Sequence, residues 1–316
     1  MENKNLILSG RYEILDTLGH GNDGIVYLVR HQSLEMNRAL KLFPKKGAPS
    51  LFAISEAKIL KTVQHPGIPT IYDFEEDESF FYLVEEYIQG VSLEEFLLHQ
   101  QSISQNLFFN FCEQLCDIFA YLHTLCPNPI VYQDLKPEHI IVCELQIKLI
   151  DFSVASFIAN SGNDFNHLGN HAFSAPELSL NEPITPVSDI YSIGKIIDFM
   201  LPFVNAPLSR NILYITQKAT NPEPMFRYQT VYELSDALNK TKESLGKTHL
   251  LQKIAVIGSH SGCGCTHIAI SLVSTLNYLG HHAVYQEENW TNCLRKALLE
   301  MDQIKEHNGC YYYQCF

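Results

Sequence analysis

The stretch from residue 130 to residue 151, IVYQDLKPEHIIVCELQIKLID, constrains the fold of this chain more than any other. Two short apolar runs, Ile140–Cys143 and Ile147–Ile150, are separated by polar residues, which is the pattern of a β-hairpin. An acid stands on each side of this hairpin, because Asp134 precedes it and Asp151 follows its second run. The stretch therefore predicts two turns that carry acidic residues and are held in place by strands.

The charged residues of this stretch are the types that phosphoryl transfer requires. Such a reaction needs a carboxylate to orient the attacking hydroxyl, a cation near the moving charge, and a second carboxylate on the metal that bridges the phosphates. The order Asp134-x-Lys136-Pro, hairpin, Asp151-Phe resembles the catalytic loop and the metal-binding motif of protein kinases. This resemblance implies that Asp134 and Lys136 are catalytic and that Asp151 binds metal. The alternative to a catalytic loop is a surface turn between strands that happens to carry charged residues. This alternative is disfavoured if the other kinase motifs occur in the right order.

A glycine-rich hairpin is predicted near the start of the chain, over residues 12–30. Its turn contains Gly19, Gly21 and Gly24, and Val26 follows on the returning strand. Glycine lets backbone N–H groups approach phosphate oxygens without a Cβ in the way. The pattern resembles the kinase glycine-rich loop, which implies that these glycines bind ATP and that Val26 covers the adenine ring.

Two further motifs follow at kinase spacing. Arg-Ala39-Leu-Lys41 is similar to the kinase strand Val-Ala-Ile-Lys, and a helix is expected over residues 51–63 with Glu56 on its apolar side. By the resemblance, Ala39 and Lys41 belong to the ATP site, and Glu56 pairs with Lys41 and holds it on the phosphates. The alternative for Glu56 is a solvated acid on an exposed helix face.

The strand expected over residues 80–86 leads into Glu86-Tyr87-Ile-Gln-Gly, which resembles the hinge between the two kinase lobes. The resemblance implies that adenine bonds to the backbone of Glu86 and Tyr87. Glu85 stands where the family usually has an apolar residue, so the back of the pocket is expected to be more polar than usual.

The second half of the chain carries the remaining kinase motifs. Apolar residues that step by three and four over residues 107–125 predict a long buried helix. Ala-Pro-Glu177 matches the end of the kinase activation segment, and Asp189 matches the residue that braces the catalytic loop. Arg227 is the expected buried partner of Glu177. These three residues are predicted to be structural, because a desolvated ion pair fixes geometry more than it adds stability.

Five positions of the catalytic region depart from the family pattern. Tyr132 and Gln133 replace His-Arg, so the arginine that would hold a phosphorylated activation segment is missing, and control by such phosphorylation is not expected. Ser153 replaces the glycine after Asp-Phe, and Asn170 replaces a threonine that bonds the catalytic acid. His139 replaces the asparagine that binds the second ion. An imidazole suits Mn²⁺ better than Mg²⁺ if it binds the ion, and the alternative is a histidine packed under the loop.

Composition excludes several classes of protein. With 316 residues and 46% hydrophobic residues, the chain can form a two-lobed domain of about 250 residues and a smaller unit. A net charge of −13 argues against binding to nucleic acid or to an anionic membrane. No apolar run reaches the roughly 18 residues that cross a bilayer. The nine scattered cysteines and the absence of an apolar signal core predict a cytoplasmic protein.

The segment after residue 252 reads strand, glycine-rich turn and helix, which resembles the start of a ParA/MinD-like P-loop fold. Gly-Cys265-Thr stands where that motif has Gly-Lys-Thr, so we expect a degenerate or truncated αβ module without nucleotide hydrolysis. His260, Cys263, Cys265 and His267 offer the ligands of a zinc site, although Cys-x-Cys within one tight loop is poor spacing for it.

Six kinase motifs in the right order make the resemblance specific over about residues 12–239. We therefore expect an α+β, two-lobed protein-kinase fold at residues 1–239, a linker at 240–252 and the αβ module at 253–316. The resemblance implies a bacterial serine/threonine kinase with a signalling role, using ATP with Mg²⁺ or Mn²⁺ and acting on protein hydroxyls. A pseudokinase that only binds nucleotide or docks a partner is the main alternative. A kinase of small molecules is disfavoured by the Ala-Pro-Glu segment, which in the family receives a peptide.

Overall fold

The computed structural model describes residues 7–8, 10–20, 24–45, 49–158, 172–180, 182–205, 210–246, 256, 264–278, 304–307 and 310–313. The chain forms two compact units, residues 1–247 and residues 248–316, each of which is described by itself below. Gly21, Asn170, His260 and Cys263 lie outside the described residues, so the expectations for them stay predictions.

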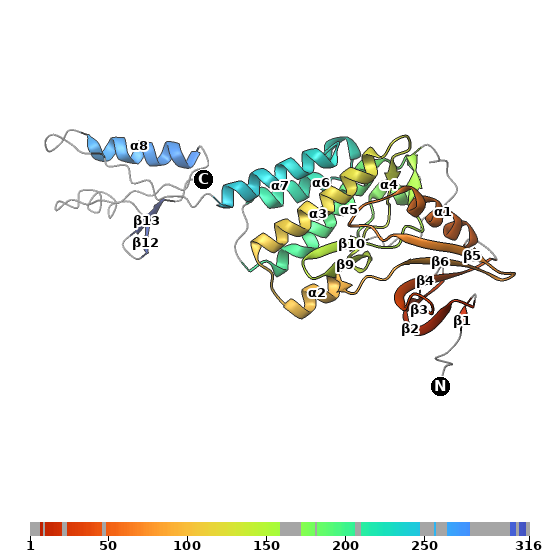
Figure 1. Ribbon diagram of the computed structural model, residues 1–316. Coiled ribbons are helices and arrows are strands. Elements are labelled where there is room, and N and C mark those ends of the chain that lie inside the picture. Colours follow the sequence, from red (N-terminus) through yellow and green to blue (C-terminus); the bar gives the residue numbers. More distant parts are fainter. Residues whose placement is uncertain are drawn as a thin grey trace. The chain divides into compact units, whose positions relative to one another are not determined.

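A six-stranded antiparallel sheet forms the N-terminal part of the first unit (Figure 1). Its strands are, in spatial order, β1 (Ile7–Leu8), β2 (Tyr12–His20), β3 (Ile25–His31), β4 (Met36–Pro44), β6 (Phe80–Glu86) and β5 (Ile71–Glu76). Helix α1 (Pro49–Thr62) contacts β4, β5 and β6. The glycine-rich hairpin predicted over residues 12–30 is therefore β2 and β3, and the predicted helix is α1.

The strand register assigns different roles to the two faces of this sheet. One face carries a small apolar cluster of Tyr12, Val29, Leu40, Tyr82 and Val84. Side chains alternate along a strand, and directly paired residues share a face. The pairs Val26–Lys41, Lys41–Leu83 and Ala39–Glu85 therefore place these side chains together on the opposite face. This face, called the pocket face below, holds Val26, Ala39 and Lys41 of the residues that the sequence assigns to the ATP site.

The C-terminal part of the first unit is mostly helical (Figure 1). Its helices are α2 (Leu93–Gln100), α3 (Gln105–Thr124), α4 (Pro176–Leu180), α5 (Pro186–Met200), α6 (Arg210–Ala219) and α7 (Val231–Gly246). Short strands complete it, namely β7 (Val91–Ser92), β8 (Ile130–Val131), β9 (Ile140–Cys143), β10 (Gln146–Leu149) and β11 (Ser156–Phe157). β9 and β10 form the hairpin predicted after Asp134, and β8 pairs with β11.

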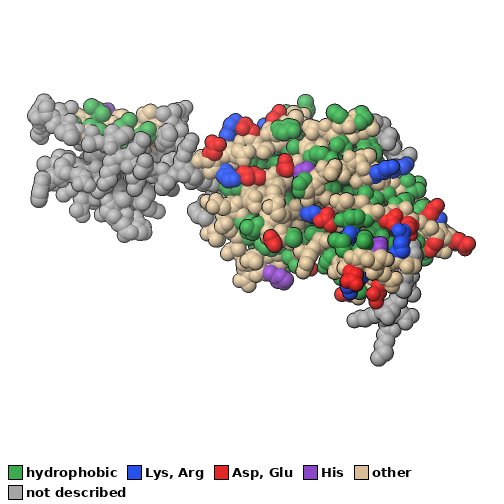
Figure 2. All heavy atoms as spheres, in the orientation of Figure 1, with side chains coloured by type: hydrophobic (Ala, Val, Ile, Leu, Met, Phe, Trp, Pro, Cys, Tyr) green, Lys and Arg blue, Asp and Glu red, His purple; other side chains and the backbone are tan. Residues whose placement is uncertain are grey.

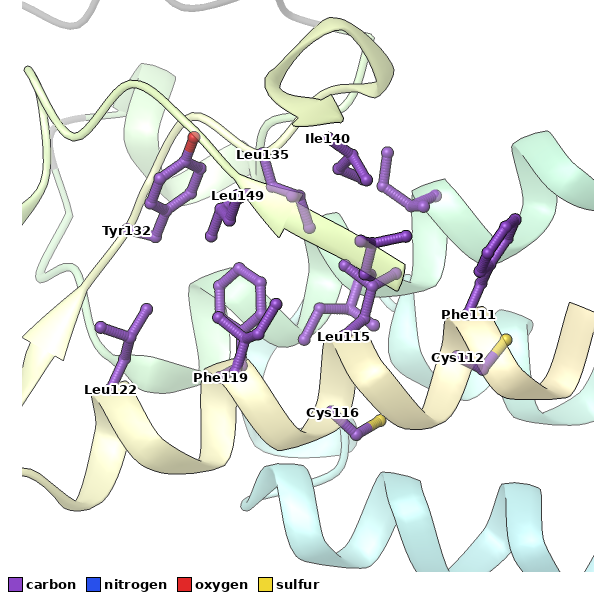
Figure 3. Packing of buried hydrophobic residues seen from close by; sticks show 14 of the residues in the cluster. Phe111, Cys112, Leu115, Cys116, Phe119, Leu122, Tyr132, Leu135, Ile140 and Leu149 are labelled. Carbon is purple, nitrogen blue, oxygen red and sulfur yellow. The ribbon is translucent and has the colours of Figure 1, made fainter. Parts of the chain in front are cut away.

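Helix α3 lies at the centre of the main core, as its apolar spacing predicts. Ser104 caps its N-terminus by accepting a hydrogen bond from the Leu107 N–H. Figure 3 shows its inner side chains packing towards the catalytic loop and the β9–β10 hairpin. Cys112 and Cys116 are buried in this core as free thiols, and burial raises the pKa of Cys116 to about 12. These two cysteines therefore behave as small apolar residues.

The surface of the first unit mixes charged and apolar side chains. On the face drawn in Figure 2, acidic and basic side chains are interspersed with hydrophobic ones. Within the described ranges, no helix is both long and apolar enough to cross a membrane.

The second unit is described at helix α8 (Cys265–Tyr278) and at the antiparallel pair β12 (Ile304–His307) and β13 (Cys310–Tyr313). Helix α8 coincides with the helix expected after the glycine-rich turn. The strands expected on either side of it lie almost entirely outside the described residues. Helix α7 continues through residue 239 to residue 246, and the predicted division into kinase domain, linker and αβ module stays a prediction.

Candidate active site

A buried ion pair joins the sheet to helix α1. The Lys41 Nζ atom on β4 lies 2.5 Å from the Glu56 Oε1 atom on α1. The Glu56 side chain is fully buried, and that of Lys41 is 9% exposed. Glu56 is therefore not the exposed acid that the sequence left as an alternative. A pair this deeply buried fixes the position of the lysine ammonium relative to the helix.

Two further carboxylates surround the same lysine. The Lys41 Nζ atom lies 3.6 Å from Asp151 Oδ1 and 3.8 Å from Glu85 Oε1. Burial opposes the charge on Lys41, but Asp151, Glu56 and Glu85 outweigh it and hold the pKa of the lysine above its ordinary value. Burial also raises the pKa of Glu56 to about 7, although Lys41 acts in the opposite direction. Lys41 is thus a fixed cation on the pocket face of the sheet.

The turn after β10 aims Asp151 at this cluster. Asp151 adopts the left-handed conformation, with φ of 65°, and its Oδ1 atom accepts a hydrogen bond from the Ser153 N–H at 3.3 Å. Burial opposes ionisation of Asp151, but Lys41, His139 and the hydrogen bonds with Ser153 together outweigh it, and the pKa of this carboxyl lies below its ordinary value. The neighbouring Phe152 N–H donates to Glu56 Oε1 at 3.0 Å. Strand β4, helix α1 and this turn therefore converge on one ion-pair network.

The catalytic loop is held from below by Asp189 of α5. Its two carboxylate oxygens accept hydrogen bonds from the Tyr132 and Gln133 N–H groups, both at 2.9 Å. His123 of α3 also contacts Asp189, with 2.8 Å between Nε2 and Oδ2. A fully buried carboxylate with three partners fixes the loop backbone just before Asp134.

Asp134 and Lys136 lie at the surface of this braced loop. The Lys136 Nζ atom donates to Asp134 Oδ2 at 3.0 Å. The Lys136 side chain is 24% exposed and that of Asp134 is 17% exposed, so both can meet a molecule from outside. The loop thus presents a carboxylate and an adjacent cation, which is the arrangement that the sequence assigns to catalysis.

His139 lies between the two acids. Its Nδ1 atom is 3.0 Å from the Asp134 backbone oxygen, and its Nε2 atom is 3.5 Å from Asp151 Oδ2. Burial lowers the pKa of this imidazole, so the neutral form is favoured. If the Nδ1–H group donates to the Asp134 carbonyl, the Nε2 lone pair points towards the Asp151 carboxylate. The imidazole nitrogen and the carboxylate could then bind the same divalent cation.

Glu177 and Arg227 form the expected structural pair in the C-terminal lobe. The guanidinium donates to both carboxylate oxygens, at 2.6 Å and 2.8 Å, and also to the backbone oxygens of Asn221, Val187 and Pro222. Burial opposes ionisation of Glu177, but the arginine lowers its pKa overall. The pair ties the Ala-Pro-Glu segment to the segment before α7.

The glycine-rich hairpin and the hinge border the pocket face. A Cβ atom on Gly24 would lie 2.1 Å from the Leu42 backbone oxygen, so β3 and β4 can approach this closely only with glycine there. Gly19 pairs with Val26 across the hairpin. The Glu86 side chain at the end of β6 accepts a hydrogen bond from Lys148 Nζ at 2.6 Å.

Tyr87 follows Glu86 in the segment that resembles the kinase hinge, and its side chain is only partly exposed. Gly90 closes this segment against β9, because a Cβ atom there would lie 2.4 Å from the Val142 backbone oxygen. The end of the hinge-like segment therefore lies directly against β9.

Three contacts of the site were not predicted from the sequence. His123 meets Asp189 across 66 residues, and Lys148 meets Glu86 across 62. Gln133 takes the place of the missing arginine and donates to the Ser156 hydroxyl at 2.6 Å. This bond links the catalytic loop to β11, at the start of the activation segment.

This geometry is that of a protein kinase, and the comparisons agree. The chain belongs to the protein kinase family, because the model of the protein kinase domain matches residues 12–269. The expected fold, with a β-rich N-terminal lobe and a mostly helical C-terminal lobe, is confirmed. The match ends within the segment that was compared with a P-loop fold, and that comparison stays a prediction.

The relatives that the chain matches include serine/threonine-protein kinases. The chain is 27% identical to serine/threonine-protein kinase PrkC of Bacillus subtilis over 260 residues, covering 72% of this chain and 40% of PrkC. It is 31% identical to death-associated protein kinase 2 of Mus musculus over 245 residues, covering 72% and 65%. It is 30% identical to the human SNF-related serine/threonine-protein kinase over 220 residues, covering 66% and 28%. The chain thus spans less than two thirds of each of these relatives.

Proposed function

We propose that this protein transfers the γ-phosphoryl group of ATP to serine or threonine hydroxyls of a protein substrate. The observation that carries the proposal is the buried Lys41–Glu56 pair with Asp151 beside it, 3.6 Å from the lysine. A protein has little structural reason to gather three carboxylates, two of them buried, around one lysine, because desolvation makes such a cluster costly. A site that binds the phosphates and metal of a nucleotide provides the missing cations and donors.

ATP is proposed to lie against the pocket face of the sheet. Val26 and Ala39 would cover the adenine ring, whose edge would bond to the backbone of Glu86 and Tyr87. Lys41 would bind the α- and β-phosphates, and the glycine-rich turn would lie over them. Glu56 acts through Lys41, since it holds the ammonium 2.5 Å from its own carboxylate.

In the transfer step, Asp134 accepts a hydrogen bond from the substrate hydroxyl and aims its oxygen at the γ-phosphorus. A bond forms between that oxygen and phosphorus, and the bond from phosphorus to the β,γ-bridging oxygen breaks. The electron pair leaves with ADP, and the hydroxyl proton passes to Asp134. Lys136, 3.0 Å from Asp134, lies where it can offset negative charge on the moving group.

A divalent ion fits the residues that face each other here, Asp151 and His139. When bound, it would neutralise charge on the β- and γ-phosphates. Among the described residues, no group of three or more His, Cys, Asp and Glu side chains is arranged to hold a metal ion. The ion would therefore complete its shell with phosphate and water oxygens, as Mg²⁺ commonly does in kinases.

The test is phosphate transfer from γ-labelled ATP to a generic basic protein, with Mg²⁺ or Mn²⁺, followed by analysis of the phosphorylated amino acids. We expect label on serine or threonine, and loss of label with Asp134→Asn. Equal labelling by the wild type and Asp134→Asn would contradict the role of Asp134. Label on tyrosine alone would contradict the substrate class.

A pseudokinase is the second candidate, and the departures at Gln133, His139 and Ser153 favour it. Such a module would bind ATP or a partner protein without transferring phosphate. Binding of ATP should still raise the thermal midpoint by mass action. A raised midpoint without any transfer, in either metal, would support this candidate over the enzyme.

The proposal also includes a cytoplasmic location, a bacterial source and a role in signalling. The scattered cysteines support the location, and the likeness to PrkC supports the source. Fractionation of cells that produce the protein tests the location.

A further inference from the structure

Glu85 is a buried acid on the pocket face whose charge the ion-pair network does not fully satisfy. The residue is 4% exposed and lies on β6, directly opposite Ala39 of β4. Its Oε1 atom is 3.8 Å from Lys41 Nζ, too long for a hydrogen bond. Its Oε2 atom is buried and has no hydrogen-bond partner within the described part of the chain.

Lys41 cannot meet this need, because other acids hold it more closely. Glu56 lies 2.5 Å from the ammonium and Asp151 lies 3.6 Å from it. A buried acceptor without a donor costs about 1–3 kcal/mol, and more if it is charged. The Glu85 carboxylate thus calls for a hydrogen-bond donor that this part of the protein does not supply.

The position of Glu85 indicates which part of a ligand would meet it. Its sequence neighbour Glu86 belongs to the proposed hinge, and its cross-strand partner Ala39 belongs to the proposed cover of the base. Lys41, on the same face, is proposed to meet the phosphates. A base bound between Ala39 and the hinge would therefore have its hinge-facing edge beside Glu85.

We propose that Glu85 accepts a hydrogen bond from the exocyclic amino group of adenine and thereby selects ATP over GTP. The inference rests on the proposed function, since it needs ATP on this face of the sheet. Adenine carries an amino donor at the position where guanine carries a carbonyl acceptor. A carboxylate facing that carbonyl gains no bond and remains unpaired, so guanine is rejected by the same group that binds adenine.

A different role for Glu85 is that of a remote charge partner for Lys41 alone. In that case its removal would change the affinity for ATP and for GTP by the same factor, because the two nucleotides have identical phosphates. The ratio of the ATP affinity to the GTP affinity therefore shows whether Glu85 hydrogen-bonds to the base or interacts only with Lys41.

The experiment measures the affinity of the full chain for ATP, GTP and purine riboside triphosphate, which lacks the 6-amino group, by calorimetry with Mg²⁺. We expect the wild type to favour ATP over both others by about tenfold or more. Glu85→Gln should narrow the ATP-to-GTP ratio by about tenfold, because its amide N–H can donate to the guanine carbonyl. Glu85→Leu should bring ATP and purine riboside triphosphate to similar affinities.

Glu76→Gln is the matched control, since this glutamate lies on the neighbouring strand β5 with its side chain 60% exposed. It should leave all three affinities unchanged, and urea unfolding shows whether each variant is folded. An unchanged ATP-to-GTP ratio in folded Glu85→Gln would overturn the inference while leaving the proposed function intact. A wild type that binds no nucleotide would overturn both.

Discussion

Replacing Lys41 by methionine should cost both catalysis and stability. Methionine keeps much of the apolar stem but leaves Glu56, Glu85 and Asp151 around a site without a cation. Removal of one partner of a buried ion pair costs about 3–5 kcal/mol. Typical domains are stable by about 5–15 kcal/mol, so Lys41→Met should lose a large part of the total without necessarily unfolding. Phosphate transfer should fall to background.

The size of this effect is measured by urea unfolding, in which the midpoint should fall and the slope should stay constant. The double variant Lys41→Met with Glu56→Gln should recover part of the loss, with a coupling energy of about 0.5–3 kcal/mol. Lys45→Met is the control, since Lys45 makes a more exposed pair with Glu76, worth about 0–1 kcal/mol. If Lys41→Met and Lys45→Met unfold at the same urea concentration, the Lys41 cluster is not buried as described.

Three further outcomes are expected. His139→Asn should raise the Mg²⁺-supported rate relative to the Mn²⁺-supported rate, and an unchanged ratio would show that the imidazole does not bind the ion. Glu177→Gln should destabilise the protein most above the ordinary glutamate pKa of 4.5 and progressively less below it, because the pKa of Glu177 is lowered in the folded state. Urea unfolding of the wild type and the variant at several pH values measures this loss of stability. A loss that does not change with pH would contradict the prediction. Gly24→Ala should lower the thermal midpoint through a backbone clash, whereas Gly19→Ala, with open space around its Cβ, should not. Equal midpoints would refute the close strand approach.

Local sequence patterns were enough to predict the main elements. Alternating apolar residues and glycines predict the β2–β3 hairpin, and steps of three and four predict α3. The chemical types of Lys41 and Glu56 suggest that they pair, but only the packing of α1 against β4 brings them to 2.5 Å. The motif supplied the partners, and the fold supplied the distance and the burial that make the pair rigid.

Other parts of the site depend on contacts that no local pattern encodes. Within the described part of the chain, Glu85 Oε2 has no hydrogen-bond partner. This results from the β4–β6 register and from the two other acids that lie nearer to Lys41. The Gln133–Ser156 bond depends on how the chain returns after β10. The left-handed conformation of Asp151 comes from the same turn and is rare for a residue other than glycine. Each of these needs the three-dimensional path of the chain.

The most direct test of the central claim measures ATP binding and phosphate transfer on the same samples of wild type and Asp134→Asn. The geometry puts Asp134 at the surface of a loop that Asp189 braces, and Asp134 is not among the carboxylates that contact Lys41. We therefore predict equal ATP affinity for the two proteins, and a transfer rate that falls by about 10²-fold or more in Asp134→Asn. Wild-type protein that binds ATP with Mg²⁺ or Mn²⁺ but transfers no phosphate to any protein hydroxyl would contradict the claim.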